Sequence, residues 1–170
     1  MKLTKLFIAI LFIGTIFSCS NDDNEDNGES NNTIIGTWTM VEMEANGATT
    51  YQGFPVTIVG EGSNFNGTTI FTEDPNEVVS NATFNLDVEV KIAGQTVAEE
   101  SYNDDISEEE TSTWSLDGNQ LTITDNTTNE SQTVSIEFSN NGNTITFEKI
   151  MPVEYSGVSV DIDVKVVYTK

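Results

Sequence analysis

Polar and apolar residues alternate strictly along three stretches of the chain. Apolar side chains occupy every second position over 84–92, 134–138 and 158–166, and Asn, Asp, Glu, Lys or Ser residues lie between them. Because successive side chains of a β-strand point to opposite faces, each stretch predicts a strand with one buried and one solvated face. We find no stretch with the periodicity of an amphipathic helix. The pattern therefore predicts an all-β fold.

Turn sequences separate segments of this kind. Asn66-Gly67, Ala93-Gly94, Asp117-Gly118 and Asn141-Gly142 each lie between two alternating segments. Asn-Gly and Asp-Gly adopt at low cost the positive φ that tight hairpins need. Asn46-Gly47 predicts a turn within a longer loop. Hairpins between consecutive strands indicate an antiparallel meander.

These segments and turns together predict a single β domain over 34–170. About eight to ten short antiparallel strands avoid exposed edges best by closing into a barrel, and a two-layer β-sandwich is the alternative. Whether neighbouring segments merge is left open. The predicted strands span 36–45, 54–63, 68–73, 78–92, 95–103, 111–117, 120–125, 132–139, 143–150 and 157–169.

The chain begins with a segment typical of export. Lys2 and Lys5 precede the apolar run 6–17, which at about 12 residues is too short to span a bilayer as a helix. Such a run is typical of a secretory signal peptide, which we predict over 1–18. Cys19, the single Cys of the chain, follows immediately. A plain secretory signal with an incidental Cys is the alternative.

The residues around this Cys resemble a known processing motif. Ile16-Phe17-Ser18-Cys19 resembles the lipobox of bacterial lipoproteins, with Phe where a small residue is usual. The resemblance implies that 1–18 is removed and that Cys19 is diacylated. Two or more acyl chains give stable membrane anchoring, so the implied partner of Cys19 is a membrane.

An acidic segment separates Cys19 from the β domain. Residues 20–32 include no apolar side chain and no base, so they cannot bury enough surface to offset the entropy of ordering. We predict a disordered tether over 19–33. Its acids resemble the signal that exports Bacteroidota lipoproteins to the outer face of the outer membrane, which implies a lipid-anchored, surface-exposed location. A solvated linker without that role is the alternative.

Composition excludes several function classes. The chain has 28 Asp and Glu against six Lys, with no Arg and no His, and a formal charge of -22. It therefore lacks the cationic groups that bind nucleic-acid phosphates. Without His, neither a Cys/His zinc site nor a His-assisted nucleophile can form. We predict no metal and no cofactor, and we expect Asp104-Asp105 with Glu108–Glu110 to form a solvated loop rather than a weak Ca²⁺ site.

Three segments of the β domain resemble a known family. Ile35–Met40 is similar to the Gly-x-Trp opening strand of lipocalins, and 113–123 and 72–76 resemble the lipocalin-like lipoproteins common in Bacteroidota. The similarity spans roughly 34–169 and implies a lipocalin-like barrel. In lipocalins an Arg from the end of the barrel covers the opening Trp. Because this chain has no Arg, Lys165 or Lys170 is the candidate for that position.

The inferred inward faces determine the functional prediction. They are apolar and offer no convergent polar groups of the kind that an active site needs, so we predict a non-catalytic protein that binds a small apolar ligand. The alternative is a structural or interaction lipoprotein with a filled barrel, accessory to an outer-membrane complex whose members the sequence does not identify. The residues expected to line the ligand or to pack the core are Trp38, Phe84, Leu86, Val88, Trp114, Ile136 and Phe147.

Overall fold

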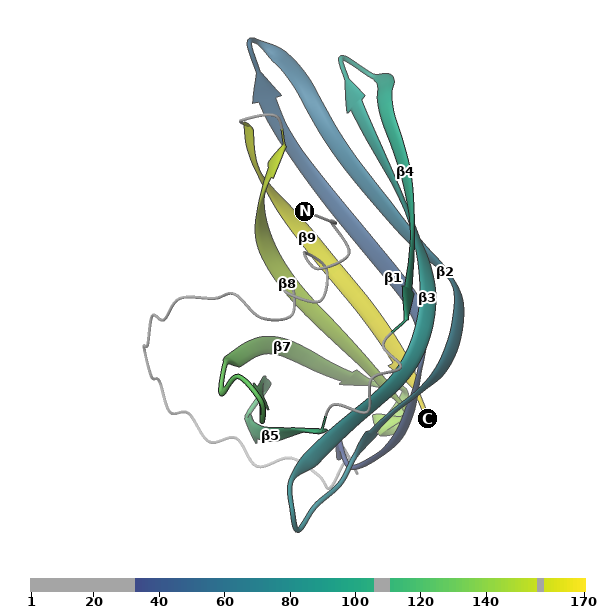
Figure 1. The fold of residues 1–170 in the computed structure, drawn as a ribbon, viewed down its shortest axis with the longest axis vertical. Coiled ribbons are helices and arrows are strands. Elements are labelled where there is room, and N and C mark those ends of the chain that lie inside the picture. The colour runs from purple at the N-terminus through teal and green to yellow at the C-terminus, as the bar shows by residue number, and fades with distance from the viewer. Residues whose placement is uncertain (1–32, 106–110, 156–157) are drawn as a thin grey trace.

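A computed structural model of the chain describes residues 33–105, 111–155 and 158–170 (Figure 1). The predicted signal peptide, Cys19 and nearly all of the tether lie outside these residues, and so do Glu108–Glu110. Among the residues that are described, no helix is long and apolar enough to cross a membrane.

The described residues form nine strands and one short 3-10 turn, and every strand pairing is antiparallel. The prediction of an all-β antiparallel fold is confirmed. The elements are β1 (Gly36–Tyr51), β2 (Phe54–Phe71), β3 (Glu77–Ile92), β4 (Gln95–Asp105), β5 (Thr111–Asp117), β6 (Gln120–Asp125), β7 (Ser131–Ser139), η1 (Asn140–Gly142), β8 (Thr144–Tyr155) and β9 (Val158–Thr169).

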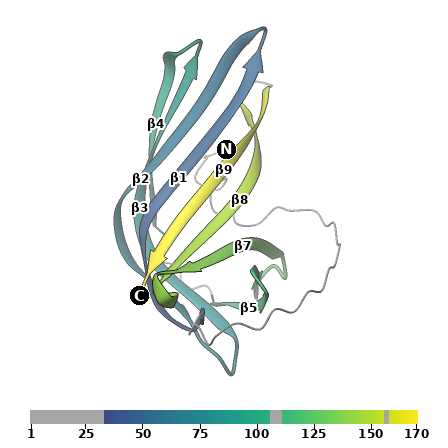
Figure 2. The same ribbon diagram turned by 180° about the vertical axis from the view of Figure 1, so that it is seen from behind.

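Eight of the nine strands form a continuous ring of hydrogen bonds. The sheet order is β2-β1-β9-β8-β7-β6-β5-β3-β4, and an additional pairing between β2 and β3 closes it. β4 stands outside this ring and pairs with β3 (Figure 2). The ring confirms a barrel rather than a two-layer sandwich.

The ring is complete at only one end of the barrel. β3 pairs with β5 over Glu77–Val79 alone, and further along it pairs with β4 instead. The ladder between β7 and β8 stops at Ser135 and Glu148, beyond which β8 pairs with β9 only. We call the end near Gly36 and the C-terminus the closed end. The opposite end, where β4 and β8 are the outer strands, is the open end (Figure 1).

Two predicted turns are wrong. Asn66-Gly67 lies within β2, which joins the predicted strands 54–63 and 68–73 and ends at Phe71, and the β2–β3 register shifts between Ser63 and Asn66. The β-bulge therefore lies at Asn64-Phe65, where Asn64 has positive φ, and Asn66-Gly67 follows it in regular pairing with Thr83 and Ala82. Asn46-Gly47 lies within β1 and pairs with β2. β1 and β2 remain paired beyond this point, and the turn between them lies at Gln52-Gly53, where both residues have positive φ.

The other predicted turns are confirmed. Ala93-Gly94 connects β3 and β4, and Gly118 lies in the turn between β5 and β6. Asn141-Gly142 lies in η1, between β7 and β8. In the turn that follows β6, the Asp125 carboxylate accepts hydrogen bonds from the backbone N–H groups of Thr127 and Thr128 at 2.5 and 2.9 Å. That carboxylate stabilises the turn.

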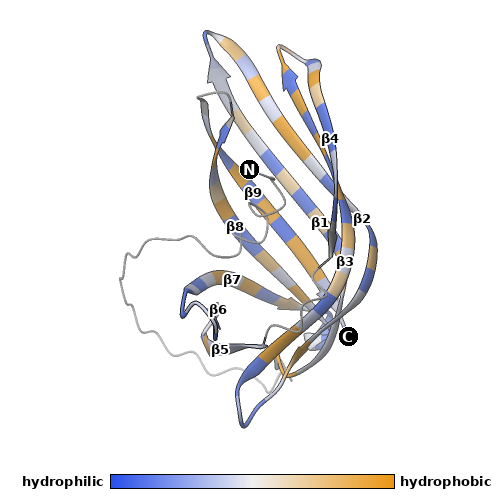
Figure 3. Cartoon of the chain, in the orientation of Figure 1, coloured by the Kyte–Doolittle hydropathy of each residue, from blue (hydrophilic) through white to orange (hydrophobic). Residues whose placement is uncertain are grey.

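The alternation of the sequence appears directly in the sheet, where apolar and polar positions follow one another along each strand (Figure 3). The apolar side chains gather on the inner face and form three buried clusters. One fills the closed end, one lies at mid-height and one lies toward the open end. The inner face is thus the core of the protein.

The closed end is sealed at Trp38, which is 1% exposed. Its indole N–H donates to the carbonyl of Ile34 at 2.6 Å. The ammonium of Lys170 lies 4.5 Å from the ring centroid and donates to the Thr33 carbonyl at 3.1 Å. Of the two candidates, Lys165 and Lys170, it is therefore Lys170 that covers the opening Trp. Lys165 points to the outer face, where it pairs with Glu42 at 2.5 Å.

Candidate binding site on the inner face

The inner face toward the open end is almost wholly aliphatic. Its buried side chains come from β1, β2, β3 and β9, and they are Ala45, Val56, Ile58, Val90, Val160 and Ile162. A second layer of half-buried side chains packs against them and includes residues of the outer strands β4 and β8. These are Val88, Ile92, Ala98, Val153 and Val164. We call the two layers together the aliphatic cluster.

Large aromatic side chains occupy the closed end. Phe71 and Trp114 meet edge to face with ring centroids 6.0 Å apart, and Phe147 and Tyr168 do so at 5.2 Å. Leu121, at 0% exposed, packs in the same cluster. The closed end is therefore a packed core, and a ligand would have to bind nearer the open end.

The structure places all seven predicted inner-face residues in the continuous core. Trp38, Trp114, Ile136 and Phe147 lie in the closed-end cluster. The β3 residues Phe84 and Leu86 lie at mid-height, and Val88 connects that level with the aliphatic cluster. Of the seven, Val88 is therefore the residue nearest the open end.

The inner face is less uniformly apolar than the sequence analysis inferred. Gln132 of β7 is only 5% exposed, in phase with the inward Val134 and Ile136. Lys149 of β8 follows the inward Phe147 in the same phase. The Lys149 ammonium donates to the Gln132 amide oxygen at 2.9 Å. Their phase along the strands identifies both residues as inward-facing, whereas their hydropathy alone does not.

These two side chains meet where the ring opens. The β7–β8 ladder ends at Ser135 and Glu148, and the contact between Lys149 and Gln132 bridges the two strands just beyond that point. Burial lowers the pKa of the Lys149 ammonium from its ordinary value, because a low-dielectric environment disfavours the charged form. A cation is thus held at the junction of the closed and open ends.

A second polar group lies on β4, the outer strand on the other side. Tyr102 and Glu100 pair with the inward Leu86 and Val88 of β3. The Tyr102 hydroxyl donates to the Glu100 carboxylate. Burial, together with this acceptor, raises the pKa of Tyr102 to about 12.

Tyr168 carries a prediction for alkaline pH. Burial raises its pKa to about 12, against an ordinary value of 10.0. The folded state therefore holds the phenolic proton more tightly than the unfolded chain does. The stability that Tyr168 contributes is complete below pH 10 and is lost as the pH rises from about 10 to about 12. Urea unfolding at several pH values should show this decline. Tyr168→Phe is expected to flatten the decline, and an unchanged slope in that variant would contradict the assignment.

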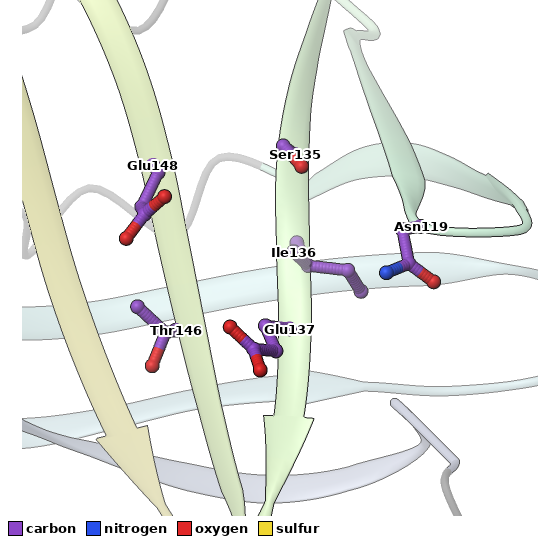
Figure 4. A pocket seen from close by; sticks show the side chains of 6 residues that line it. All are labelled: Asn119, Ser135, Ile136, Glu137, Thr146 and Glu148. Carbon is purple, nitrogen blue, oxygen red and sulfur yellow. The ribbon is translucent and has the colours of Figure 1, made fainter.

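A separate groove lies on the outer face of β7 and β8 (Figure 4). Its volume is about 190 Å³, below the roughly 300–1,000 Å³ of ordinary small-molecule sites. Nowhere in the described part of the chain do three or more metal-ligating side chains gather. The groove is thus a shallow, polar surface feature, lined by Asn119, Ser135, Ile136, Glu137, Thr146 and Glu148.

Comparison with known proteins agrees with this geometry. The profile of the lipocalin-like domain family matches residues 34–147, which is more than half of the chain. Proteins with this fold typically bind ligands rather than catalyse reactions. Among curated proteins and among solved structures, nothing matches the chain.

Proposed function

The chain belongs to the lipocalin-like domain family, and from this premise we propose that it is a non-catalytic cell-envelope lipoprotein that binds a small apolar ligand on its inner face. The aliphatic cluster is the observation that carries the ligand-binding part of this proposal. It continues the apolar inner face beyond the point where the ring of hydrogen bonds stops. Its outer layer is only half-buried, so an apolar ligand entering from the open end would contact that layer.

The envelope part of the proposal depends on the N-terminal sequence. The apolar run 6–17, Cys19 and the acidic segment after it support a diacylated lipoprotein of the Bacteroidota type. They also support attachment to the outer membrane with the barrel on the cell surface. A mature chain of this kind would keep its ligand site outside the cell while Cys19 holds it to the membrane.

One experiment tests both parts. The protein is isolated from the membranes of its own cells and measured by mass spectrometry, first denatured and then under native conditions. The denatured chain is expected to lack residues 1–18 and to carry acyl groups at Cys19. The native protein is expected to retain a non-covalent small molecule. A free thiol at Cys19 would overturn the envelope proposal. An unliganded mass, with no rise in melting temperature on addition of fatty acids or isoprenoids, would overturn the binding proposal.

A matched pair of variants on β8 locates the site. Val153 is half-buried on the inner face, whereas Ile150 is 65% exposed on the outer face. Val153→Asn is expected to weaken ligand binding about tenfold, since burying one such side chain contributes ~1.5 kcal/mol or more. Ile150→Asn on the same strand is expected to leave affinity unchanged. Fluorescent-probe displacement measures both, and equal losses in the two variants would argue against an inner-face site.

The alternative function has its own support in the closed end. Leu121 and Ile145 are 0% exposed there, as expected of a barrel that is filled by its own side chains. If the native protein carries no ligand, a structural lipoprotein accessory to an envelope complex becomes the better interpretation.

A further inference from the structure

The hairpin between β1 and β2 ends in two exposed aromatic side chains. Tyr51 and Phe54 flank the Gln52-Gly53 turn and pair with each other across it. They are 41% and 56% exposed. Rings that stay largely in water contribute little to the core. Exposed apolar groups that lie together typically mark a surface that contacts a protein or a membrane.

Both rings continue the inner face of the barrel. Phe54 precedes the buried Val56 and Ile58 in the same strand phase. Tyr51 shares that face, because directly paired residues of two antiparallel strands point to the same side. The two rings therefore lie at the mouth of the open end, directly beyond the aliphatic cluster. A surface that covered them would be continuous with the inner face.

The hairpin between β3 and β4 enlarges this surface. The Ala93 N–H donates to the Pro55 carbonyl at 2.8 Å, which joins the two hairpins. Val97, near the start of β4, is 53% exposed. β8 and β9 end below both hairpins in the two views (Figures 1 and 2). We call residues 51–55 and 92–97 the open-end tip.

The open-end tip carries no charge in a strongly acidic chain. Residues 45–60 and 92–98 include no Asp, Glu or Lys, although the formal charge of the chain is -22. At the closed end, by contrast, the turn between β2 and β3 carries Glu73 and Asp74. Acidic surfaces are repelled by anionic membranes and by other acidic proteins. The tip is therefore the part of this surface that can approach an apolar or neutral partner at the lowest electrostatic cost.

A lipid bilayer fits the tip better than a second copy of the chain does. A two-residue hairpin turn is narrow and convex, so it buries little area on another protein but can enter between lipid head groups. Tyr is enriched at membrane interfaces, where its ring contacts apolar chains and its hydroxyl stays hydrated. Two copies of a chain with a charge of -22 would repel each other.

We propose that the open-end tip docks onto a neutral lipid bilayer, with Tyr51 and Phe54 inserted at the level of the head groups. The mouth of the barrel would then face the membrane, and the path from the bilayer to the aliphatic cluster would be apolar. Docking itself requires only the tip. The consequence that an apolar ligand passes directly between the bilayer and the inner face rests on the proposed function.

The proposed anchor is compatible with this orientation. Two inserted rings alone bind a membrane weakly, so a second attachment is needed for stable docking. The segment from Cys19 to Thr33 reaches at most about 50 Å when fully extended. This matches the roughly 50 Å that the 16 residues of β1 span. The anchor and the tip can thus reach the same bilayer, although Thr33 lies at the closed end.

Two labelling sites test which end of the barrel meets the bilayer. Gln52→Cys places a thiol at the open-end tip, and Asn76→Cys places one in the exposed closed-end turn. Both are made in the full chain with Cys19→Ser, so that no other thiol reacts. Each thiol carries the fluorophore NBD, and the vesicles are phosphatidylcholine with or without a nitroxide-labelled phosphatidylcholine. At position 52 we expect vesicles to shift the emission to shorter wavelength and the nitroxide to quench it, with little change at position 76.

A matched pair of double variants tests the two rings. Tyr51→Ser with Phe54→Ser is expected to lose most of the quenching at position 52. Val41→Ser with Ile150→Ser removes two exposed apolar side chains from the outer face and is expected to keep it. The apolar run 6–17 is the same in every variant, so binding that it adds cancels in the comparison. Circular dichroism checks that both variants are folded.

The outcomes separate docking from the proposed function. Docking is overturned if the emission at position 52 does not respond to vesicles, if both positions respond equally, or if the ring variant keeps its quenching. A shift at position 52 that grows with protein concentration without vesicles would also overturn it, in favour of contact between two copies. The retained small molecule expected in the native mass is measured independently. If it is present and the tip stays in water, the function stands and docking fails; if it is absent and the tip is quenched, the reverse holds.

Discussion

Trp38→Ala is expected to lower the free energy of unfolding by about 3–5 kcal/mol, the usual cost of truncating a buried Trp. Trp38 is 1% exposed and belongs to the closed-end cluster. The substitution leaves a large cavity in that cluster. It also removes the donor to the Ile34 carbonyl and the ring beneath the Lys170 ammonium. Since whole domains are stable by only about 5–15 kcal/mol, the variant should be close to unfolding at ambient temperature.

Urea unfolding monitored by circular dichroism measures this loss, and Val41→Ala provides the control. Val41 is also on β1, but it is 46% exposed, so its truncation should change stability by no more than about 0.5 kcal/mol. A loss below ~1.5 kcal/mol for Trp38→Ala would mean that Trp38 does not seal the closed end. Lys170→Met separates the cation from the ring, and we expect it to cost about 1 kcal/mol.

The barrel combines a packed end with an end that is only half covered. At the closed end, eight strands complete the ring and aromatic side chains fill the interior. At the open end, β4 and β8 each pair on one side, and the inner residues between them are aliphatic. Stability and binding are therefore expected to respond to different substitutions. Truncation at Trp38 should strongly destabilise the protein, and Val153→Asn should weaken binding with little loss of stability.

The sequence predicts the local elements well because alternation and burial coincide. The predicted strand 78–92 differs from β3 by one residue, and 111–117 and 120–125 match β5 and β6. In these segments most inward positions are apolar, so the period of two is clear. Merged strands were harder to predict, because an Asn-Gly pair is typical of a tight turn and here lies within a strand in two places.

The long-range arrangement could not be predicted in the same way. Hairpin turns specify which consecutive strands pair, but the contacts β3–β5 and β1–β9 depend on how the whole sheet curls. Nothing local indicates that β4 leaves the ring. Gln132 and Lys149 were missed for another reason: hydropathy marks inward positions by their apolar character, so a polar residue in the inward phase looks like an interruption of the pattern. Their phase relative to Val134 and Phe147 is the signal that identifies them.

Gly67→Ala is the second large effect that we expect, with a loss above roughly 4 kcal/mol, the range that marks a strained site. Gly67 follows the β-bulge of β2 and has a φ of +99°. A Cβ at this position would lie 1.9 Å from the carbonyl oxygen of Asn81 and 2.8 Å from the Cα of Ala82. Both atoms are backbone of the neighbouring strand β3, so no side chain can rotate away to make room. The β2–β3 pairing, which helps to close the ring, would have to separate.

Gly53→Ala isolates the steric part of this effect. Gly53 also has positive φ, +84°, but a Cβ there would meet nothing within 4 Å. Its substitution should therefore cost only the backbone strain of a left-handed residue, about 1–2 kcal/mol. Soluble yield and urea unfolding compare the two variants, and the yield remains informative if Gly67→Ala does not fold. Similar losses in both would show that β2 and β3 separate easily at the bulge. A much larger loss at Gly67 would show that close contact between these backbones holds the barrel closed.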